Sequence, residues 1–162
     1  MNTRIARLPL PAVLGVAILA MALFWGAPAV QAVASRGTAE EAAALVNRAV
    51  DLLATTDRDA AFAAFNDPRG SFVDRDLYVF VVGLNGVALA HGSNKGLIGK
   101  SVSTVRDPDG KAFVQAILDT AKEKGEGWVD YTWINPETRK AEPKSSYVKR
   151  AGDLAICVGI YK

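Results

Sequence analysis

The sequence predicts an α+β fold, in which helices pack against an antiparallel β-sheet. Helical periodicity covers residues 39 to 54 and 111 to 124, whereas β-branched and aromatic residues dominate several short segments elsewhere. These strand-like segments follow one another with short links, which favours antiparallel neighbours. We expect the long first helix to cover one face or edge of the sheet and a loop with a shorter helix to arch over the other, leaving a cavity where a small ligand would bind.

The first 32 residues have the pattern of a secretory signal peptide. Arg4 and Arg7 precede an apolar stretch over residues 11 to 25, and residues 30 to 32 (VQA) match the small-x-small pattern of a cleavage site. We therefore expect a mature periplasmic chain of residues 33 to 162. The uncharged run around the apolar stretch is also long enough to span a bilayer, so an uncleaved anchor in the inner membrane, facing the periplasm, is the alternative.

The mature chain has the size of one domain and no excess of charge. Cleavage removes two arginines and no acid from the 19 basic and 17 acidic residues, which leaves 17 of each. This balance, without a basic run interleaved with aromatics, argues against nucleic acid as a partner. Cys157, the only cysteine of the sequence, lies in the apolar run "LAICVGIY" and is expected to be a small buried hydrophobe.

Two helices are expected to open the domain. Thr38 and Glu41 have capping-box spacing ahead of the helix over residues 39 to 54. Asp57 is a predicted N-cap for a second helix that contains Phe62 and Phe65, and "DPRG" ends it.

A β-hairpin, a loop, a helix and three strands are expected to follow. "LYVFVV" and "VALAH" flank an Asn-Gly turn, and the next segment to residue 110 is punctuated by Gly, Asn and Ser. Asp109 is expected to cap the helix over residues 111 to 124, which Gly125 would end. The last strands are predicted over residues 127 to 134, 144 to 150 and 154 to 161.

Aromatic residues gather around a lysine in "GWVDYTWINPETRKAEPKSSYVKR". On a strand, Tyr131 and Trp133 share one face and Trp128 lies on the other. Strict alternation then separates Lys144 from Tyr147, unless a proline or bulge shifts the start of their strand. This cluster is either ordinary sheet packing or the wall of a pocket for a small anionic or polar molecule, most simply a carboxylate.

Catalytic and metal-binding motifs are missing from the sequence. His91 is the only histidine, and with one cysteine it cannot form a zinc or copper site; we expect it to be a ligand contact or a surface residue. The sequence has no nucleophile elbow, phosphate loop or zinc-protease motif. Asp74 and Asp76 are expected to form a solvated turn rather than an acid/base pair. We therefore predict no enzyme activity and no cofactor.

From about Thr38 to Lys162 the chain resembles a single Cache domain, the extracytoplasmic sensor module of bacterial receptors. The matching pieces are "YVFVVGLNGVALAHG", "GKSVSTVRDPDGKAFVQAI", "GEGWVDYTWINPETRKAEPKSSYVKR" and "LAICVGIY". The Y-x-W, P-K-x-x-Y and terminal G-x-Y patterns carry most of this resemblance.

The resemblance implies a PAS-like fold with a long N-terminal helix packed on a five-stranded antiparallel sheet, and a role in sensing short organic acids or amino acids. Carried over by position, the ligand-binding residues would be Phe80, His91, Tyr131, Trp133, Lys144 and Tyr147. Members of the family usually lie between two membrane helices, so we expect this sequence, which ends at Lys162, to need a membrane sensor or another envelope protein for signalling. The alternatives are an envelope protein-interaction module without a small ligand and a small envelope enzyme.

Overall fold

The computed structural model describes residues 36 to 162, and the predicted leader at residues 1 to 32 lies outside the described residues. The described elements are the helices α1 (Ala39–Thr55), α2 (Arg58–Phe65) and α3 (Phe113–Asp119), the 3₁₀ turn η1 (Lys95–Leu97), the π-helical turn η2 (Thr120–Lys124), and the strands β1 (Val73–Asp74), β2 (Leu77–Gly83), β3 (Ala88–His91), β4 (Glu126–Ile134), β5 (Ala141–Ala151) and β6 (Leu154–Tyr161). None of the helices within residues 36 to 162 is both long and apolar enough to cross a membrane.

The strands form one antiparallel sheet, which confirms the predicted α+β class. Its order is β1-β2-β6-β5-β4, and β3 also pairs with β2. The five predicted strands correspond to β2 through β6, and β1 adds a pair of only two residues. The long ladders β4–β5 and β5–β6 bring the aromatic-lysine segment next to the C-terminal strand.

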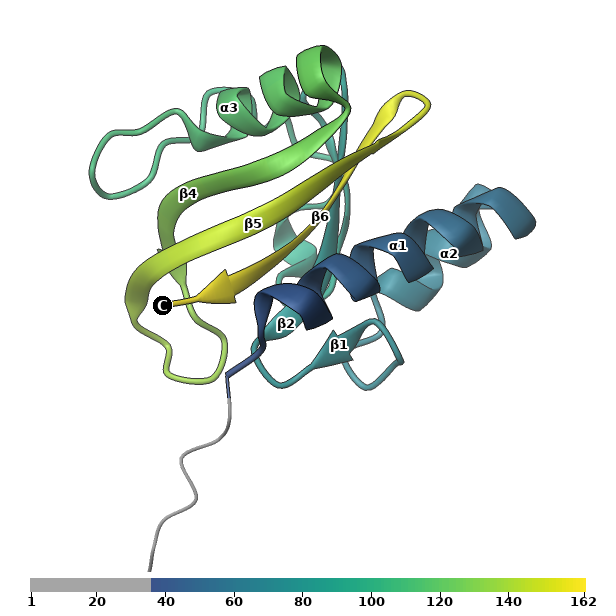
Figure 1. The fold of residues 1–162 in the computed structure, drawn as a ribbon, viewed down its shortest axis with the longest axis horizontal. Helices are drawn as coiled ribbons and strands as arrows, with labels where there is room; N and C mark the ends of the chain where they lie inside the picture. Colours follow the sequence, from purple (N-terminus) through teal and green to yellow (C-terminus); the bar gives the residue numbers. More distant parts are fainter. Residues whose placement is uncertain (1–35) are drawn as a thin grey trace, which may run out of the picture. The chain divides into compact units, whose positions relative to one another are not determined.

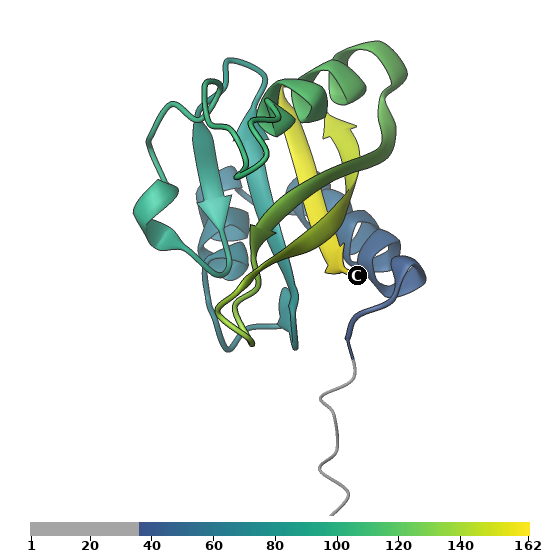
Figure 2. The same ribbon diagram turned by 90° about the vertical axis from the view of Figure 1, so that its left-hand side faces the viewer.

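Helices cover both faces of the sheet (Figures 1 and 2). α1 and α2 lie on one face, while α3 and the segment that connects β3 to it lie on the other. Each layer has its own apolar core: Tyr78, Phe80 and Val82 belong to the core under α3, and the alternate residues of β2 to the core under α1. Burial on both faces explains why β2 reads as a continuous apolar run. Cys157 is buried on β6, as predicted.

The capping box that begins α1 is present. The Thr38 hydroxyl accepts from the backbone N–H of Glu41 at 3.2 Å, and the Glu41 carboxylate accepts from the N–H of Thr38 at 2.9 Å. The two side chains thus satisfy N–H groups that have no partner within the helix.

α3 is shorter than the sequence suggested, and the prediction that Asp109 caps it is wrong. The helix begins at Phe113, and Asp109 instead accepts from the hydroxyl of Thr132 on β4 at 2.9 Å. The reason is Asp107, two residues earlier. Its carboxylate accepts hydrogen bonds from the backbone N–H groups of Asp109 and Lys111, which folds this segment into a turn. A π-helical turn then continues the helix to Lys124.

The "DRD" turn before β2 is only half solvated, so the prediction for Asp76 is wrong. Asp74 is exposed, but Asp76 is 2% exposed. Between them, Arg75 has a φ of 56°, in the left-handed region that turns the chain sharply. The Asp76 side chain is thereby buried and accepts a hydrogen bond from the backbone N–H of Gly37 at 2.8 Å.

Candidate ligand-binding site

A cavity of about 40 Å³ lies between the sheet and the segment that carries α3. By this measure a single water needs about 10 to 15 Å³, so the space suits a ligand of a few heavy atoms. Its wall is almost wholly apolar and comes from β2, β3, β4, α3 and the loop between β3 and α3. The lining residues are Tyr78, Phe80, Val81, Val82, Ala88, Ala90, His91, Leu97, Val102, Val105, Phe113, Val114, Tyr131 and Trp133.

Lys144 lies directly behind this wall. Its side chain is almost fully buried, and the ammonium donates to the hydroxyls of Tyr78 at 2.7 Å and Tyr161 at 3.3 Å. The same Nζ atom is 3.9 Å from the ring centroid of Tyr78 and 4.6 Å from that of Tyr161. Tyr78 and Phe80, whose ring centroids lie 3.9 and 5.7 Å from Nζ, also line the cavity, so the buried cation lies beside the ligand space.

The G-x-Y pattern at the chain end has a structural reason at this lysine. A Cβ atom on Gly159 would lie 2.1 Å from Cε of Lys144 and 2.5 Å from Oγ of Ser146. Only glycine therefore leaves room for the lysine stem as it crosses β6. Tyr161, two residues further, accepts from the ammonium and donates to the carbonyl of Ile134 at 2.7 Å.

The buried ammonium has no close carboxylate partner. Among the ion pairs of residues 36 to 162, none includes Lys144, and its partners are hydroxyls and ring faces. Burial lowers the pKa of Lys144, opposed by the Tyr78 hydroxyl and by the charge of Asp76. Such a cation is stabilised further by an anion placed beside it.

His91 supplies a neutral polar group to the cavity wall. Its ring stacks on Tyr78 and Phe80, with centroid distances of 5.1 and 5.7 Å. Burial, with a smaller effect from the Lys144 charge, lowers the pKa of His91 to about 3. Its Nδ1 atom accepts from the backbone N–H of Asn94 at 3.0 Å, which assigns the ring proton to Nε2.

Aromatic rings close the opposite side. Tyr131 stacks almost parallel on Phe113 of α3, with centroids 4.3 Å apart, and Trp133 lies 5.2 Å from the same ring. The Tyr131 hydroxyl pairs with Oγ of Ser146 at 2.8 Å, so this polar atom is already satisfied. The wall can therefore pack an apolar ligand group while the lysine side offers charge.

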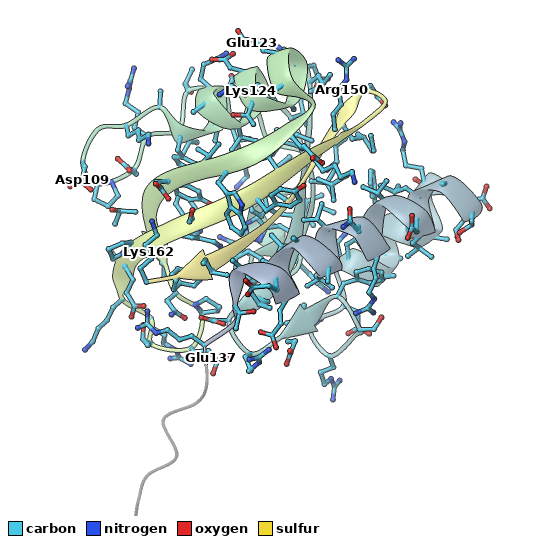
Figure 3. The ribbon with its side chains drawn as sticks, in the orientation of Figure 1. Asp109, Glu123, Lys124, Glu137, Arg150 and Lys162 are labelled. Carbon is cyan, nitrogen blue, oxygen red and sulfur yellow. The ribbon has the colours of Figure 1, made fainter. Side chains whose placement is uncertain are left out.

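Asp107 fastens the loop over the cavity to β4. One carboxylate oxygen accepts from the N–H groups of Asp109 at 3.0 Å and Lys111 at 2.8 Å, and the other accepts from Thr132 at 3.1 Å. Burial alone would raise the pKa of Asp107, but these backbone donors hold it below its usual value. Asp109, which is labelled in Figure 3, lies on this loop two residues after Asp107.

The structure brings together five of the six residues singled out by the sequence. Phe80, His91, Tyr131 and Trp133 line the cavity, and Lys144 lies behind Tyr78. Tyr147 is not among the residues that line this cavity: its ring packs at a tilt against the exposed Trp128, with centroids 5.3 Å apart, and its hydroxyl donates to Glu126 at 2.9 Å. Strand alternation is the physical reason, because no bulge interrupts the pairing of Tyr147 with Trp128.

Two residues next to the lysine escaped the sequence analysis. Tyr78 lies two positions before Phe80 on the same face of β2, so strand alternation from Phe80 would have identified it. Tyr161 is part of the G-x-Y pattern, but only the pairing of Lys144 with Tyr161 across β5 and β6 shows their contact.

The helices on both faces of the sheet, the small apolar cavity and the buried cation beside it describe an α+β domain of PAS-like architecture. The chain belongs to the single Cache domain family: the family described as Single Cache domain 2 matches residues 28–161. This confirms the resemblance found in the sequence.

Solved structures of chemotaxis sensors share this fold. A Cache chemosensory domain described in terms of carboxylic acid recognition is 28% identical, with a TM-score of 0.65 over 75% of this chain and 91% of that one. A periplasmic sensor domain of a chemotaxis protein is 29% identical, with a TM-score of 0.60 over 75% and 88% of the two chains. A methyl-accepting chemotaxis protein from Vibrio parahaemolyticus is 22% identical, with a TM-score of 0.64 over 75% and 86%, and shows the fold alone.

Among curated proteins, the methyl-accepting chemotaxis protein McpP of Pseudomonas putida is similar to this chain. The two are 30% identical over 96 residues, which is 59% of this chain and 18% of the receptor. The chain thus spans less than a fifth of the length of that receptor. These relatives are a chemotaxis protein, a sensor domain of a chemotaxis protein and a chemosensory domain.

Proposed function

We propose that this protein is a periplasmic binding domain for a carboxylate of two or three carbons. The observation that carries the proposal is the buried ammonium of Lys144 beside a small apolar cavity. An anion that approaches Tyr78 and Lys144 gains a charge-assisted interaction in a site from which water is largely excluded.

The shape and polarity of the wall support a short monocarboxylate. The apolar end of the ligand would pack between Phe80, Tyr131 and Trp133, and Nε2–H of the neutral His91 would donate to a carboxylate oxygen. A second carboxylate would have no cation to meet, because His91 is the only titratable side chain other than tyrosines among the lining residues. The similarity to a Cache domain with carboxylic acid recognition points to the same ligand class.

Thermal unfolding with a matched set of small molecules tests the proposal. Acetate and propionate should raise the melting temperature, whereas acetamide and methylammonium, of similar size without the negative charge, should not. A ligand at 100 times its dissociation constant adds about 2.7 kcal/mol, which shifts a domain near this size by several degrees. Lys144→Met should reduce the shift to about half or less, and Lys124→Met, at an exposed lysine labelled in Figure 3, should retain it. Equal shifts with acetate and acetamide would refute a charge-based site.

We further infer that the domain passes on ligand occupancy through a membrane sensor or another envelope partner, as its relationship to receptor sensor domains suggests. Two large apolar side chains on β4 are exposed and are candidate contact points for such a partner: Trp128 is 42% exposed and Ile134 is 52% exposed. If no carboxylate binds while Trp128→Ala abolishes association with a cross-linked envelope protein, the interaction-module alternative replaces the ligand-binding proposal.

A further inference from the structure

Two carboxylates are buried within residues 36 to 162, and they are satisfied very differently. Asp107 accepts three backbone N–H groups. Asp76 accepts only the N–H of Gly37 at 2.8 Å through Oδ1, and its Oδ2 is a buried oxygen without a hydrogen-bond partner. A buried carboxylate with an unpartnered oxygen is costly unless a cation compensates its charge.

Lys144 is a buried cation within electrostatic reach of Asp76. The pairing of β2 with β6 (Val79 with Val158), continued to the residue before β2, brings Asp76 beside Tyr161, and Tyr161 in turn pairs with Lys144 on β5. The charge of Asp76 accordingly raises the pKa of Lys144. Asp76 stands two residues before Tyr78, the closest acceptor of the ammonium. The two charges are not within the 4 Å of a direct ion pair, but a low-dielectric interior transmits their attraction over a longer distance.

The other charged groups near the lysine have partners of their own. Asp107, Asp109 and Asp130 line a second hollow together with Lys144, but Asp107 accepts three backbone N–H groups, Asp109 accepts from Thr132 and Asp130 pairs with Lys162.

Lys144 faces Tyr78 from β2, Tyr161 and Cys157 from β6, and His91 from β3. Burial raises the pKa values of Tyr161 and Cys157 and lowers that of His91, so these three groups are neutral near pH 7. Asp76 is the buried carboxylate whose charge raises the pKa of Lys144.

We propose that Asp76 is the internal counter-ion of Lys144, a positioning residue that keeps the ammonium charged until a carboxylate binds. The functional part of this inference rests on the proposed function, whereas the charge pairing itself does not. The hydrogen bond from Gly37 gives the pair a second contact: it ties the carboxylate to the segment that precedes α1. An anion beside Lys144 competes with Asp76 for the same cation. Ligand binding is therefore coupled to the hydrogen bond between Gly37 and Asp76.

Titration of the lysine by nuclear magnetic resonance tests the pairing without any ligand. The ¹³Cε signal of Lys144, assigned by its loss in Lys144→Met, is followed against pH in the wild type, in Asp76→Asn and in Asp74→Asn. The asparagine at position 76 keeps an oxygen for Gly37 but removes the charge. Asp74 is an exposed aspartate of the same turn and serves as the matched control. We expect the Lys144 midpoint to fall by about one pH unit or more in Asp76→Asn and to stay unchanged in Asp74→Asn.

Calorimetry with acetate at pH 7 and pH 9 separates the pairing from the function. Asp76→Asn should lose about tenfold more affinity over this interval than the wild type, because its lysine deprotonates earlier. If no variant binds acetate but the midpoint still falls, the proposed function fails and the counter-ion stands. The same Lys144 midpoint in Asp76→Asn and wild type overturns the inference.

A measurement on the wild type covers the case in which Asp76→Asn does not fold. The carboxyl carbon of Asp76 should then show a step in its chemical shift at the pH where Lys144 loses its proton, because the two charges interact. A flat response of Asp76 across that pH would equally overturn the pairing.

Discussion

Replacing Lys144 with methionine should separate the stability of the domain from its affinity. The side chain is 1% exposed and its ammonium is held by two tyrosine hydroxyls rather than by a carboxylate in direct contact. Methionine keeps a similar length and removes the charge. The two hydroxyls keep hydrogen-bond partners in this variant, because the hydroxyl oxygens of Tyr78 and Tyr161 lie 3.2 Å apart and the Tyr161 hydroxyl donates to the carbonyl of Ile134.

The two effects can be told apart in an Asp76→Asn background, which leaves no buried carboxylate without its counter-ion. Replacement of a buried pair of charges by uncharged side chains of similar volume is often neutral or stabilising by about 1 to 4 kcal/mol, so the unliganded Asp76→Asn/Lys144→Met variant should be at least as stable as the wild type, whereas Lys144→Met alone should be less stable. Loss of a hydrogen bond to a charged group costs about 1.5 to 3 kcal/mol of carboxylate binding, which is about 10- to 150-fold in the dissociation constant.

Urea unfolding without ligand and calorimetric titration with acetate measure the two quantities on the same preparations. A double variant that is stable but binds weakly would show that the lysine is retained for recognition. The reasoning is refuted if the double variant loses several kcal/mol of stability and Lys144→Met binds acetate as the wild type does, since the lysine would then be structural.

Three further predictions follow from the surroundings of the cavity. Burial lowers the pKa of His91 to about 3, so the unfolded chain binds the proton first as pH falls below about 6.5. The stability of the domain should therefore decline from about pH 6.5 toward pH 3, and His91→Gln should flatten this slope when urea midpoints at pH 5.5 and 7 are compared. Gly159→Ala should cost about 1 to 3 kcal/mol of stability through overlap with the Lys144 stem, and in chemical denaturation the cost should shrink in a Lys144→Ala background; an equal cost in both would contradict the packing argument. Asp107→Asn should cost about 1 to 3 kcal/mol and increase hydrogen exchange in the loop from 93 to 111, whereas unchanged exchange would show that the carboxylate does not fasten this loop.

The fold was largely predictable because its signals are local. The Thr38–Glu41 capping box, the strand composition of β2 and the long helical period of α1 each reflect physics within a few residues. Helix α3 was predicted too long because Asp107 removes the backbone donors that Asp109 would have capped. That competition depends on a tertiary contact with β4, which no local pattern contains.

The candidate site was predictable for those residues whose position follows from the alternation of side chains along a strand. Tyr131 and Trp133 follow from the period of a strand, and the same period excludes Tyr147 once β5 is known to have no bulge. Asp76 was missed because polar residues in a turn are usually solvated, whereas its burial involves a contact with Gly37, which is distant in the sequence.

A crystal structure of the protein grown with acetate tests the central claim most directly. The account predicts electron density for one acetate in the cavity, with its methyl group between Phe80 and Trp133 and its carboxylate within hydrogen-bonding distance of His91 Nε2 or the Tyr78–Lys144 pair. A cavity that stays closed at saturating acetate, or acetate bound with its carboxylate directed away from Lys144, would contradict it.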